Sequence, residues 1–272
     1  MHTRSGAQIV VDGDVVVKTH RAGTDVVALR HRLRIAARLG RQPDGVLVPP
    51  VSTETESAAA GSLLWTTRWP RVDVVDPDSA VVPWSESGQL LARLHRVAVQ
   101  PEDHVLQPGA PARLRRALAA MSASSTAQAA TIQRAVSALP EWVWLPAGPG
   151  RPRVLVHGDW HLGQLGRIPG ERRWRLLDID DLGVGDPAWD LARPAGFWAA
   201  GILPDADWQA FVGGYREAAG PALPPAPADP WPALDAVARV AVVQAAAMGV
   251  VTSAEDLQAQ EALVAACSRM PS

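Results

Sequence analysis

Two short apolar runs, each followed by a carboxylate, constrain this chain more than any other feature. Val154–Val156 leads into HGDWHLGQ, which carries Asp159 and Gln164, and residues 173–178 form an apolar run that ends in Asp178. Runs of this kind predict buried strands. A carboxylate after each of two neighbouring strands, with an amide between them, suits phosphoryl transfer: one carboxylate accepts a hydroxyl proton, and the other, with the amide, holds magnesium.

The first 70 residues have a β-rich pattern. The predicted elements are a hairpin over residues 8–18 that turns at Asp12-Gly13, a helix over 25–39 capped by Asp25 and ended by Gly40, and strands over 46–51 and 63–68. Trp69-Pro70 then interrupts the sheet pattern, so we expect a hinge there. The sequence therefore predicts a small, sheet-rich N-terminal region.

The remainder of the chain has a mostly helical pattern. The predicted elements are a helix capped by Ser85, a helical region over 111–138 broken near 122–125, a connector over 146–152, a hairpin of 164–168 with 173–178, and helices after Pro187 interrupted by a proline-rich linker at 221–232. Together the two regions predict an α+β chain with a β-hairpin inserted into its helical part.

Charge and composition exclude several classes of protein. The net charge is −2 and the pI is about 6.4, so we expect neither a nucleic-acid surface nor an anionic-membrane surface. A single cysteine, Cys267, excludes an internal disulfide framework. The N-terminus lacks a segment typical of a signal peptide, and the apolar stretch at 237–251 is short and interrupted. We therefore expect a cytoplasmic protein, monomeric or homodimeric.

Lys18 is the only lysine of the chain, and every other basic residue is arginine. Where a compact point charge is needed, arginine is not an equivalent replacement, because its guanidinium is a planar fork. A single lysine at the end of a predicted strand is therefore a candidate phosphate-binding residue, although one lysine can also persist by chance.

The segment HGDWHLGQ, followed by LLDIDDLGVGDPAWDLA, resembles the signature of the aminoglycoside phosphotransferase family, and its HLGQ is similar to the variant in maltokinase-type members. LLARLH at 90–95 and VVVK at 15–18 also resemble segments of that family. The resemblance covers most of the chain. It implies a two-lobed protein-kinase-like fold, with residues 1–70 as a nucleotide-binding lobe and 71–272 as a catalytic and substrate-binding lobe.

The resemblance also implies roles for individual residues. Asp159 would be the catalytic base, Gln164 and Asp178 would bind Mg²⁺, and Lys18, Thr67 and Trp69 would bind ATP or another nucleoside triphosphate. The residues expected to support the loop are His157, Asp186 and Asp190. The candidate substrate residues are Trp160, His161, Asp180, Asp181 and Trp198.

Two departures from the family pattern leave alternatives open. Gln164 stands where the family usually has asparagine, and residues 26–39 contain no acid to pair with Lys18. Asp25, or a residue outside that helix, would then have to orient Lys18. These departures motivate a second hypothesis, a pseudokinase or ligand-binding protein of the same fold. A third is a metal-dependent hydrolase with His157, Asp159 and His161 as ligands.

The C-terminal region suggests a class of acceptor. From Leu191 onward, acids outnumber arginines. The acids are Asp205, Asp207, Glu217, Asp229, Asp235, Glu255, Asp256 and Glu261, and the arginines are Arg193, Arg216, Arg239 and Arg269. An acidic pocket would suit a cationic acceptor such as an aminoglycoside or basic peptide antibiotic. A nucleoside, sugar or macrolide is the alternative. The sequence therefore predicts a small-molecule kinase, plausibly one that modifies an antibiotic.

Overall fold

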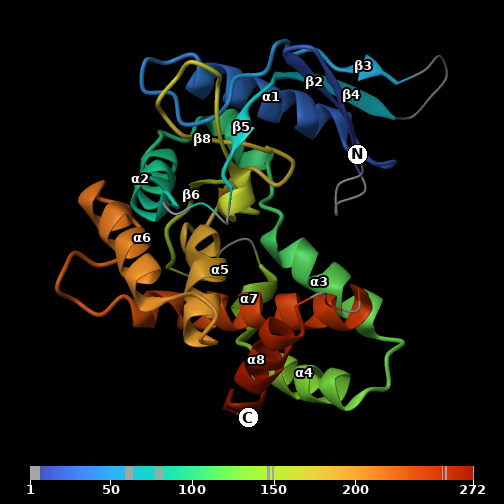
Figure 1. The fold of residues 1–272 in the computed structure, drawn as a ribbon, viewed down its shortest axis with the longest axis vertical. Coiled ribbons are helices and arrows are strands. Elements are labelled where there is room, and N and C mark those ends of the chain that lie inside the picture. The colour runs from blue at the N-terminus through green and yellow to red at the C-terminus, as the bar shows by residue number, and fades with distance from the viewer. Residues whose placement is uncertain are drawn as a thin grey trace. The chain divides into compact units, whose positions relative to one another are not determined.

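The chain leaves its first structural unit, forms part of the second, and then returns. The computed structural model describes residues 7–58, 64–76, 79, 82–145, 148, 150–252, 254 and 256–271 (Figure 1). Unit 1 contains the described residues up to Val82 together with Leu162–Asp180, and unit 2 contains Pro83–His161 and the chain from Asp181 onward. The sequence pattern had instead placed one boundary at residue 70.

A four-stranded antiparallel sheet with the order β1-β2-β4-β3 lies in unit 1. Its strands are β1 (Gln8–Asp12), β2 (Val15–Thr19), β3 (Glu56–Ser57) and β4 (Trp65–Pro70). The predicted N-terminal hairpin is confirmed: Asp12 pairs with Val15, and Gly13 occupies the turn with a φ of 59°, which glycine adopts without steric cost. Because β2 lies between β1 and β4, Lys18 is on an interior strand.

The predicted hinge at Trp69-Pro70 is wrong. These two residues are the last of β4 and pair with Val16 and Val15. Proline lacks a backbone N–H and is tolerated at the end of a strand, where a ladder hydrogen bond is dispensable. The start of the predicted strand, at residue 63, lies outside the described residues.

Residues 46–51 do not form the predicted strand. Leu47 makes one isolated parallel bridge with Leu176. Pro49 and Pro50 follow within the same run, and neither can donate to a β-ladder, so the apolar pattern overstates the strand.

Helix α1 (Val26–Gly40) is confirmed within two residues. The Asp25 carboxylate caps it by accepting hydrogen bonds from the backbone N–H groups of Val27 and Ala28, at 2.9 and 3.1 Å. On its basic face, Arg30 donates to the Thr55 hydroxyl at 2.9 Å and lies over the Trp65 ring. Asp25 and Arg30 therefore both have partners within unit 1 close to α1.

A second sheet of unit 1 has the order β5-β7-β8. Its strands are β5 (Asp73–Val74), β7 (Leu165–Arg167) and β8 (Arg175–Leu176), and the short 3-10 helix η3 (Leu162–Gln164) precedes β7. The predicted hairpin is confirmed, because Leu165 pairs with Leu176. β5 was not predicted, since two residues are too few for a periodic pattern.

Unit 2 is built mainly from helices. They are α2 (Trp84–His95), α3 (Ala110–Met121), α4 (Ala127–Ser137), α5 (Ala188–Ala199), α6 (Asp205–Glu217), α7 (Trp231–Thr252) and α8 (Leu257–Ser268), with 3-10 helices η1 (Pro101–Val105) and η2 (Glu141–Trp144). The break predicted near 122–125 is confirmed between α3 and α4. The cap predicted at Ser85 is wrong, because Pro83 precedes the helix and Ser85 lies inside its first turn.

Two glycines allow α2 and α6 to pack closely. A Cβ on Gly88 would lie 2.2 Å from the Phe211 carbonyl oxygen, and a Cβ on Gly214 would lie 2.1 Å from the Ser85 carbonyl oxygen. Any larger residue at either position would force the helices apart. This contact holds α2, and with it His95, against α6.

The two-stranded sheet of unit 2 pairs β6 (Val154–Val156) with β9 (Gly183–Gly185). The predicted strand 154–156 is therefore confirmed, but it is not in one sheet with β8. The two carboxylate-bearing strand ends belong to different units. Within the connector predicted at 146–152, residues 146, 147 and 149 lie outside the described residues.

Helix α7 packs against α5, α3, α4 and α8 (Figure 1). By length and composition it is also the one helix in the described part of the chain that could cross a membrane. That criterion is weak evidence, because a core helix also meets it. The buried residues of α7, among them Leu234, Val243 and Ala247, match a core helix of unit 2.

Candidate active site

The loop after β6 carries Asp159 through a backbone turn that requires glycine. Gly158 has a φ of 83°, and a Cβ at this position would lie 2.1 Å from the Asp181 carbonyl oxygen. Both the conformation and the close approach therefore exclude a larger side chain. Gly158 thus brings the loop close to the backbone of Asp181, at the start of the segment that leads into β9.

Asp190, on α5, holds the backbone of this loop in place. Its fully buried carboxylate accepts hydrogen bonds from the backbone N–H groups of His157 and Gly158, at 2.6 and 2.7 Å, and pairs with His95 Nε2 at 2.9 Å. His95 Nδ1 lies 2.8 Å from the Tyr215 hydroxyl. Burial alone would raise the pKa of Asp190, but these hydrogen bonds and the neighbouring histidines lower it below its ordinary value.

Asp186 and His157 make further polar contacts on either side of this segment. The Asp186 carboxylate accepts a hydrogen bond from the Ala188 N–H at 3.0 Å, at the start of α5, and forms an ion pair with Arg151. His157 is buried, and its Nδ1 accepts from the Asp159 N–H at 3.4 Å. The loop that carries Asp159 is thus fixed at its backbone by buried polar groups, as a precise catalytic position requires.

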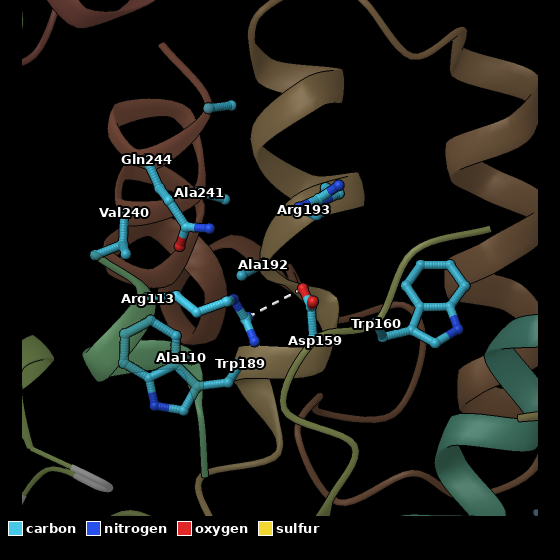
Figure 2. A pocket seen from close by; sticks show the side chains of 11 residues that line it. Ala110, Arg113, Asp159, Trp160, Trp189, Ala192, Arg193, Val240, Ala241 and Gln244 are labelled. Carbon is cyan, nitrogen blue, oxygen red and sulfur yellow. Dashed lines mark ion pairs between the residues drawn. The ribbon is translucent and has the colours of Figure 1, made fainter. Parts of the chain in front are cut away.

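The Asp159 carboxylate forms an ion pair with one arginine of unit 2. Arg113 Nη2, from α3, is 3.3 Å from Asp159 Oδ1, while Arg113 Nη1 is 2.5 Å from Asp181 Oδ2. A second arginine, Arg193 on α5, lies on another side of Asp159 (Figure 2). The Asp159 side chain remains 31% exposed, so it is accessible as well as paired.

Burial raises the pKa of Asp159 above its ordinary value. The charges of Arg113 and Arg193 oppose part of this rise, whereas the Asp181 carboxylate adds to it. A carboxylate whose pKa is raised by burial is a better proton acceptor than an exposed one. The electrostatics therefore suit a general base.

A pocket in unit 2 opens at Asp159 (Figure 2). Its lining residues are Ala110, Arg113, Asp159, Trp160, Trp189, Ala192, Arg193, Val240, Ala241, Gln244 and Ala245. Of the candidate substrate residues, Trp160 lines this pocket and stacks on Phe211 at a centroid distance of 5.0 Å. Trp198 belongs to a separate cluster with Trp208 and Trp231, and half-buried His161 is not among the lining residues.

Lys18, in unit 1, lies between two carboxylates. Its Nζ is 2.8 Å from Asp178 Oδ1 and 2.9 Å from Asp180 Oδ2. Burial alone would lower the pKa of Lys18, but the two carboxylates raise it above its ordinary value. The partner of Lys18 therefore comes from the segment after β8 and not from α1 or from Asp25.

The second carboxylate, Asp180, forms an ion pair with His20, which is itself hydrogen-bonded. His20 Nδ1 is 3.3 Å from Asp180 Oδ1, and His20 Nε2 is 2.9 Å from the Thr67 hydroxyl. Trp69 Nε1 also donates to that hydroxyl, at 2.9 Å. Burial alone would raise the pKa of Asp180, but Lys18 and His20 hold it well below its usual range. Thr67 and Trp69, expected at the nucleotide site, thus join the Lys18 cluster.

Asp178 has an unusual backbone conformation, with a φ of 54°. Few residues other than glycine adopt this region, and they concentrate at functional sites. The Asp178 carboxylate accepts from the Asp180 N–H at 3.1 Å, and the neighbouring Leu177 N–H donates to the Gln164 carbonyl oxygen at 2.8 Å. Gln164 is therefore held next to the segment that carries Asp178.

The donor set of this cluster fits a magnesium ion. Two carboxylates face one ammonium, and the buried Asp180 Oδ1, although 3.3 Å from His20 Nδ1, makes no hydrogen bond among the described residues. Mg²⁺ is commonly held by one or two carboxylates together with substrate phosphates. Asp178 and Asp180 meet that requirement.

The hydrolase hypothesis finds no support in this geometry. Among the described residues, no group of three or more His, Cys, Asp or Glu side chains is arranged to hold a metal ion. His157 instead faces the loop backbone, and Asp159 faces Arg113. The proposed triplet is therefore dispersed, because alternate positions of a tight loop point in different directions.

Three residues of these clusters were missed from the sequence. His20 carries a weak signal, because it lies two positions after Lys18 and two-residue spacing places both side chains on one face of an extended strand. Arg113 and Arg193 carry none, since each is one of many arginines and only the packing of α3 and α5 brings them to Asp159.

Solved structures of similar fold are phosphotransferases. The choline kinase LicA from Streptococcus pneumoniae has a TM-score of 0.61 at 13% identity, over 98% of this chain and 92% of that one. Spectinomycin phosphotransferase, solved with ADP and spectinomycin, has a TM-score of 0.56 at 14% identity, over 97% and 92%. Macrolide 2'-phosphotransferase type I has a TM-score of 0.52 at 18% identity, over 98% and 88%. These likenesses establish the two-lobed, protein-kinase-like fold.

The sequence comparisons are consistent with this fold. No curated protein matches the chain significantly. The model of the phosphotransferase enzyme family matches residues 7–231, which include Lys18, Asp159 and Asp178. Because this match spans most of the chain, the chain belongs to the phosphotransferase enzyme family and is a small-molecule phosphotransferase with an alcohol group as acceptor.

Proposed function

We propose that this phosphotransferase is a kinase that transfers the γ-phosphate of Mg-ATP to a hydroxyl group of its small-molecule acceptor. The observation that carries the proposal is the Asp159 carboxylate, which lies on a braced loop, lines a pocket and has a pKa raised by burial. Phosphoryl transfer depends mainly on positioning and charge stabilisation, which is what such a loop provides.

Unit 1 would hold the nucleotide. Lys18 would contact the α- and β-phosphates, and Asp178 with Asp180 would keep its ammonium in place. Trp69, at the end of β4, would lie near the base, and Thr67 would orient Trp69 through their hydrogen bond. ATP is the favoured nucleotide, and a related phosphotransferase of the same fold is named with bound ADP. The first lobe would therefore be the nucleotide-binding one.

Asp178 and Gln164 are the residues that would hold the magnesium ion. When bound, Mg²⁺ neutralises charge on the phosphates. The positive φ of Asp178 and the backbone hydrogen bond between Leu177 and Gln164 support this assignment. Glutamine retains the amide oxygen of asparagine on a side chain one methylene longer, so the substitution is compatible with metal binding.

Asp159 would act as the base. In the reaction, the acceptor hydroxyl gives its proton to the Asp159 carboxylate as its oxygen bonds to the γ-phosphorus. The bond from that phosphorus to the bridging oxygen breaks, and ADP leaves with the electron pair. His157, Asp186 and Asp190 would keep the loop in position.

The acceptor proposed from the sequence is an antibiotic, and two proteins of similar fold are named for spectinomycin and macrolides. The acidic pocket expected for a cationic antibiotic is not supported, however. None of the acids counted after Leu191 lines the pocket at Asp159, and one of them, Glu255, lies outside the described residues. We further propose a cytoplasmic enzyme that acts as a monomer or homodimer.

Substitution of the base tests the proposal most directly. Asp159→Asn should reduce kcat by about 10³-fold or more, because general-base catalysis and hydroxyl positioning are lost together, while ATP affinity stays within about twofold. Nucleotide affinity and ATP consumption are measured on the same protein. The control is Asp229→Asn, which retains a side-chain oxygen at an exposed helix start. Wild-type turnover in Asp159→Asn would overturn the assignment.

The pseudokinase alternative makes the opposite prediction. A ligand-binding protein of this fold would bind its ligand equally well with and without Asp159 and would not consume ATP. Wild-type protein that binds Mg-ATP, and whose ATP consumption rises with an acceptor and depends on Asp159, excludes it.

A further inference from the structure

The pocket at Asp159 is lined by more arginine than acidic side chains. Among the described residues that line it, Arg113 and Arg193 are the cations and Asp159 is the one acid. Gln244 adds an amide, and the other lining side chains are alanine, valine and tryptophan. Figure 2 shows the two arginines and Gln244 around the space in front of the Asp159 carboxylate. This lining is unsuited to a polycation.

Arg113 is held in place by two ion pairs. It contacts Asp159 through Nη2 and Asp181 through Nη1, and its Nε is buried. A guanidinium presents five N–H donors in a planar fork that matches carboxylate and phosphate oxygens. Asp181 lies outside the lining, so it fixes Arg113 without entering the pocket.

Arg193 provides a second cation on the same carboxylate. It is half-buried on α5 and lines the pocket, and its charge opposes part of the rise in the pKa of Asp159. Half-buried charges interact with a ligand more strongly than exposed ones, because solvent screens them less. An anion placed between Arg113 and Arg193 would therefore be attracted from two sides, close to the base.

We propose that the acceptor carries an anionic group, a carboxylate or a phosphate, a few bonds away from the hydroxyl that is phosphorylated. This inference rests on the proposed function and names its substrate class. Arg113 and Arg193 bind the anionic group, and this contact directs the hydroxyl toward Asp159. Hydroxy acids and sugar acids fit this description, and amino sugars do not.

Matched sets of acceptors test the charge preference. One set is glycerate, glycerol 3-phosphate, glycerol and 2-amino-1,3-propanediol, and the other is glucuronate, glucose and glucosamine. Each member differs from glycerol or from glucose at one carbon. Thermal stabilisation and ATP consumption are measured with Mg-ATP present. The anionic members should stabilise the protein most and give the highest kcat/KM, and the first set separates carboxylate from phosphate.

Variants that remove one positive charge then test which arginine causes the preference for anionic acceptors. Arg193→Gln and Arg113→Gln should each lower kcat/KM for the preferred anionic acceptor by about tenfold or more, as expected for loss of a charged hydrogen bond. Because both arginines also act on Asp159, kcat/KM for the neutral scaffold should fall as well but by less, so that the ratio of anionic to neutral acceptor decreases. Arg113→Lys controls for loss of the Asp159 and Asp181 ion pairs and should retain part of the preference. Arg116→Gln, at an exposed position of the same helix, should leave it unchanged.

Three outcomes decide the matter. A preference for anionic members that is lost in Arg193→Gln supports the proposal. Equal or stronger use of glucosamine or the amino diol, or no discrimination within either set, overturns it while ATP turnover still upholds the proposed function. Failure of the wild-type protein to bind nucleotide without any acceptor would instead overturn the proposed function, and this inference with it.

Discussion

Each unit has a charged side chain whose neighbours carry the opposite charge, and the signs are reversed between the two units. In unit 1, one ammonium, Lys18, lies between the carboxylates of Asp178 and Asp180. In unit 2, one carboxylate, Asp159, pairs with the Arg113 guanidinium and is also affected by the charge of Arg193. Carboxylates attract a metal ion, whereas guanidinium groups attract an anion. The contrast supports the proposal that unit 1 binds the nucleotide with its cation and that unit 2 binds the acceptor.

The two clusters also differ in their accessibility. Lys18 and His20 are buried, and His20 and Trp69 both hydrogen-bond to the Thr67 hydroxyl, so unit 1 offers a preorganised lysine. The Asp159 side chain, in contrast, is 31% exposed. Preorganisation favours binding of one constant ligand, as proposed for the nucleotide.

Substitution of Asp178, the expected metal ligand, should have the largest effect, and that effect should be confined to the nucleotide site of unit 1. Asp178→Ala should lower kcat by about 10²–10³-fold and abolish the magnesium dependence of nucleotide binding, because it removes charge stabilisation of the transferred phosphate. Calorimetric titration of ATP with and without Mg²⁺ measures this effect. Acceptor binding to unit 2 should persist. Magnesium-dependent ATP binding at wild-type affinity in Asp178→Ala would contradict the assignment.

The sequence could predict the carboxylates but not their partners. Asp159 and Asp178 were found because each follows a short apolar strand, and the β7–β8 hairpin was found from its turn residues. Lys18 and Asp178 are 160 positions apart, so their contact depends on the return of the chain to unit 1. Likewise, nothing in the spacing of α3 indicates that Arg113, among several arginines, faces Asp159. Such contacts arise from tertiary packing, which periodicity does not encode.

A smaller effect should come from the residue that replaces the missing helix acid. Asp180→Asn should raise KM for ATP by about tenfold and lower kcat less, because Lys18 keeps Asp178 but loses its second anchor. His20→Gln, which removes the His20–Asp180 ion pair, should act in the same direction by about threefold or less. Steady-state kinetics with ATP varied measure both. Asp44→Asn, at an exposed ion pair of the same unit, is the control.

Lys18→Arg tests whether the position between Asp178 and Asp180 requires a lysine. Arginine keeps the positive charge, but its fork does not fit the position of a compact ammonium between two carboxylates, so we expect KM for ATP to rise as in Asp180→Asn. Full activity in Lys18→Arg would show that the single lysine of the chain is not required for its geometry.

The smallest expected effect is a shift in the pH dependence of unit 2. Asp159 must be ionised to accept a proton, so kcat/KM should fall as the pH drops through its pKa, which burial places above the ordinary value. Arg193 lowers that pKa, and its removal should therefore move the acidic limb to higher pH, by about one unit or less. The charged groups that act on Asp159 are Arg113, Arg193, Asp181 and His157.

Asp181→Asn should shift the pH dependence in the opposite direction, because it removes a negative charge that raises the pKa of Asp159. Its acidic limb should move to lower pH, provided that Arg113 keeps its contact with Asp159. Measurement of kcat/KM against pH for the wild type, Arg193→Gln and Asp181→Asn tests both signs at once. Arg116→Gln should match the wild type. Shifts of the same sign in both variants would mean that the neighbouring charges do not tune Asp159, and that burial alone sets its basicity.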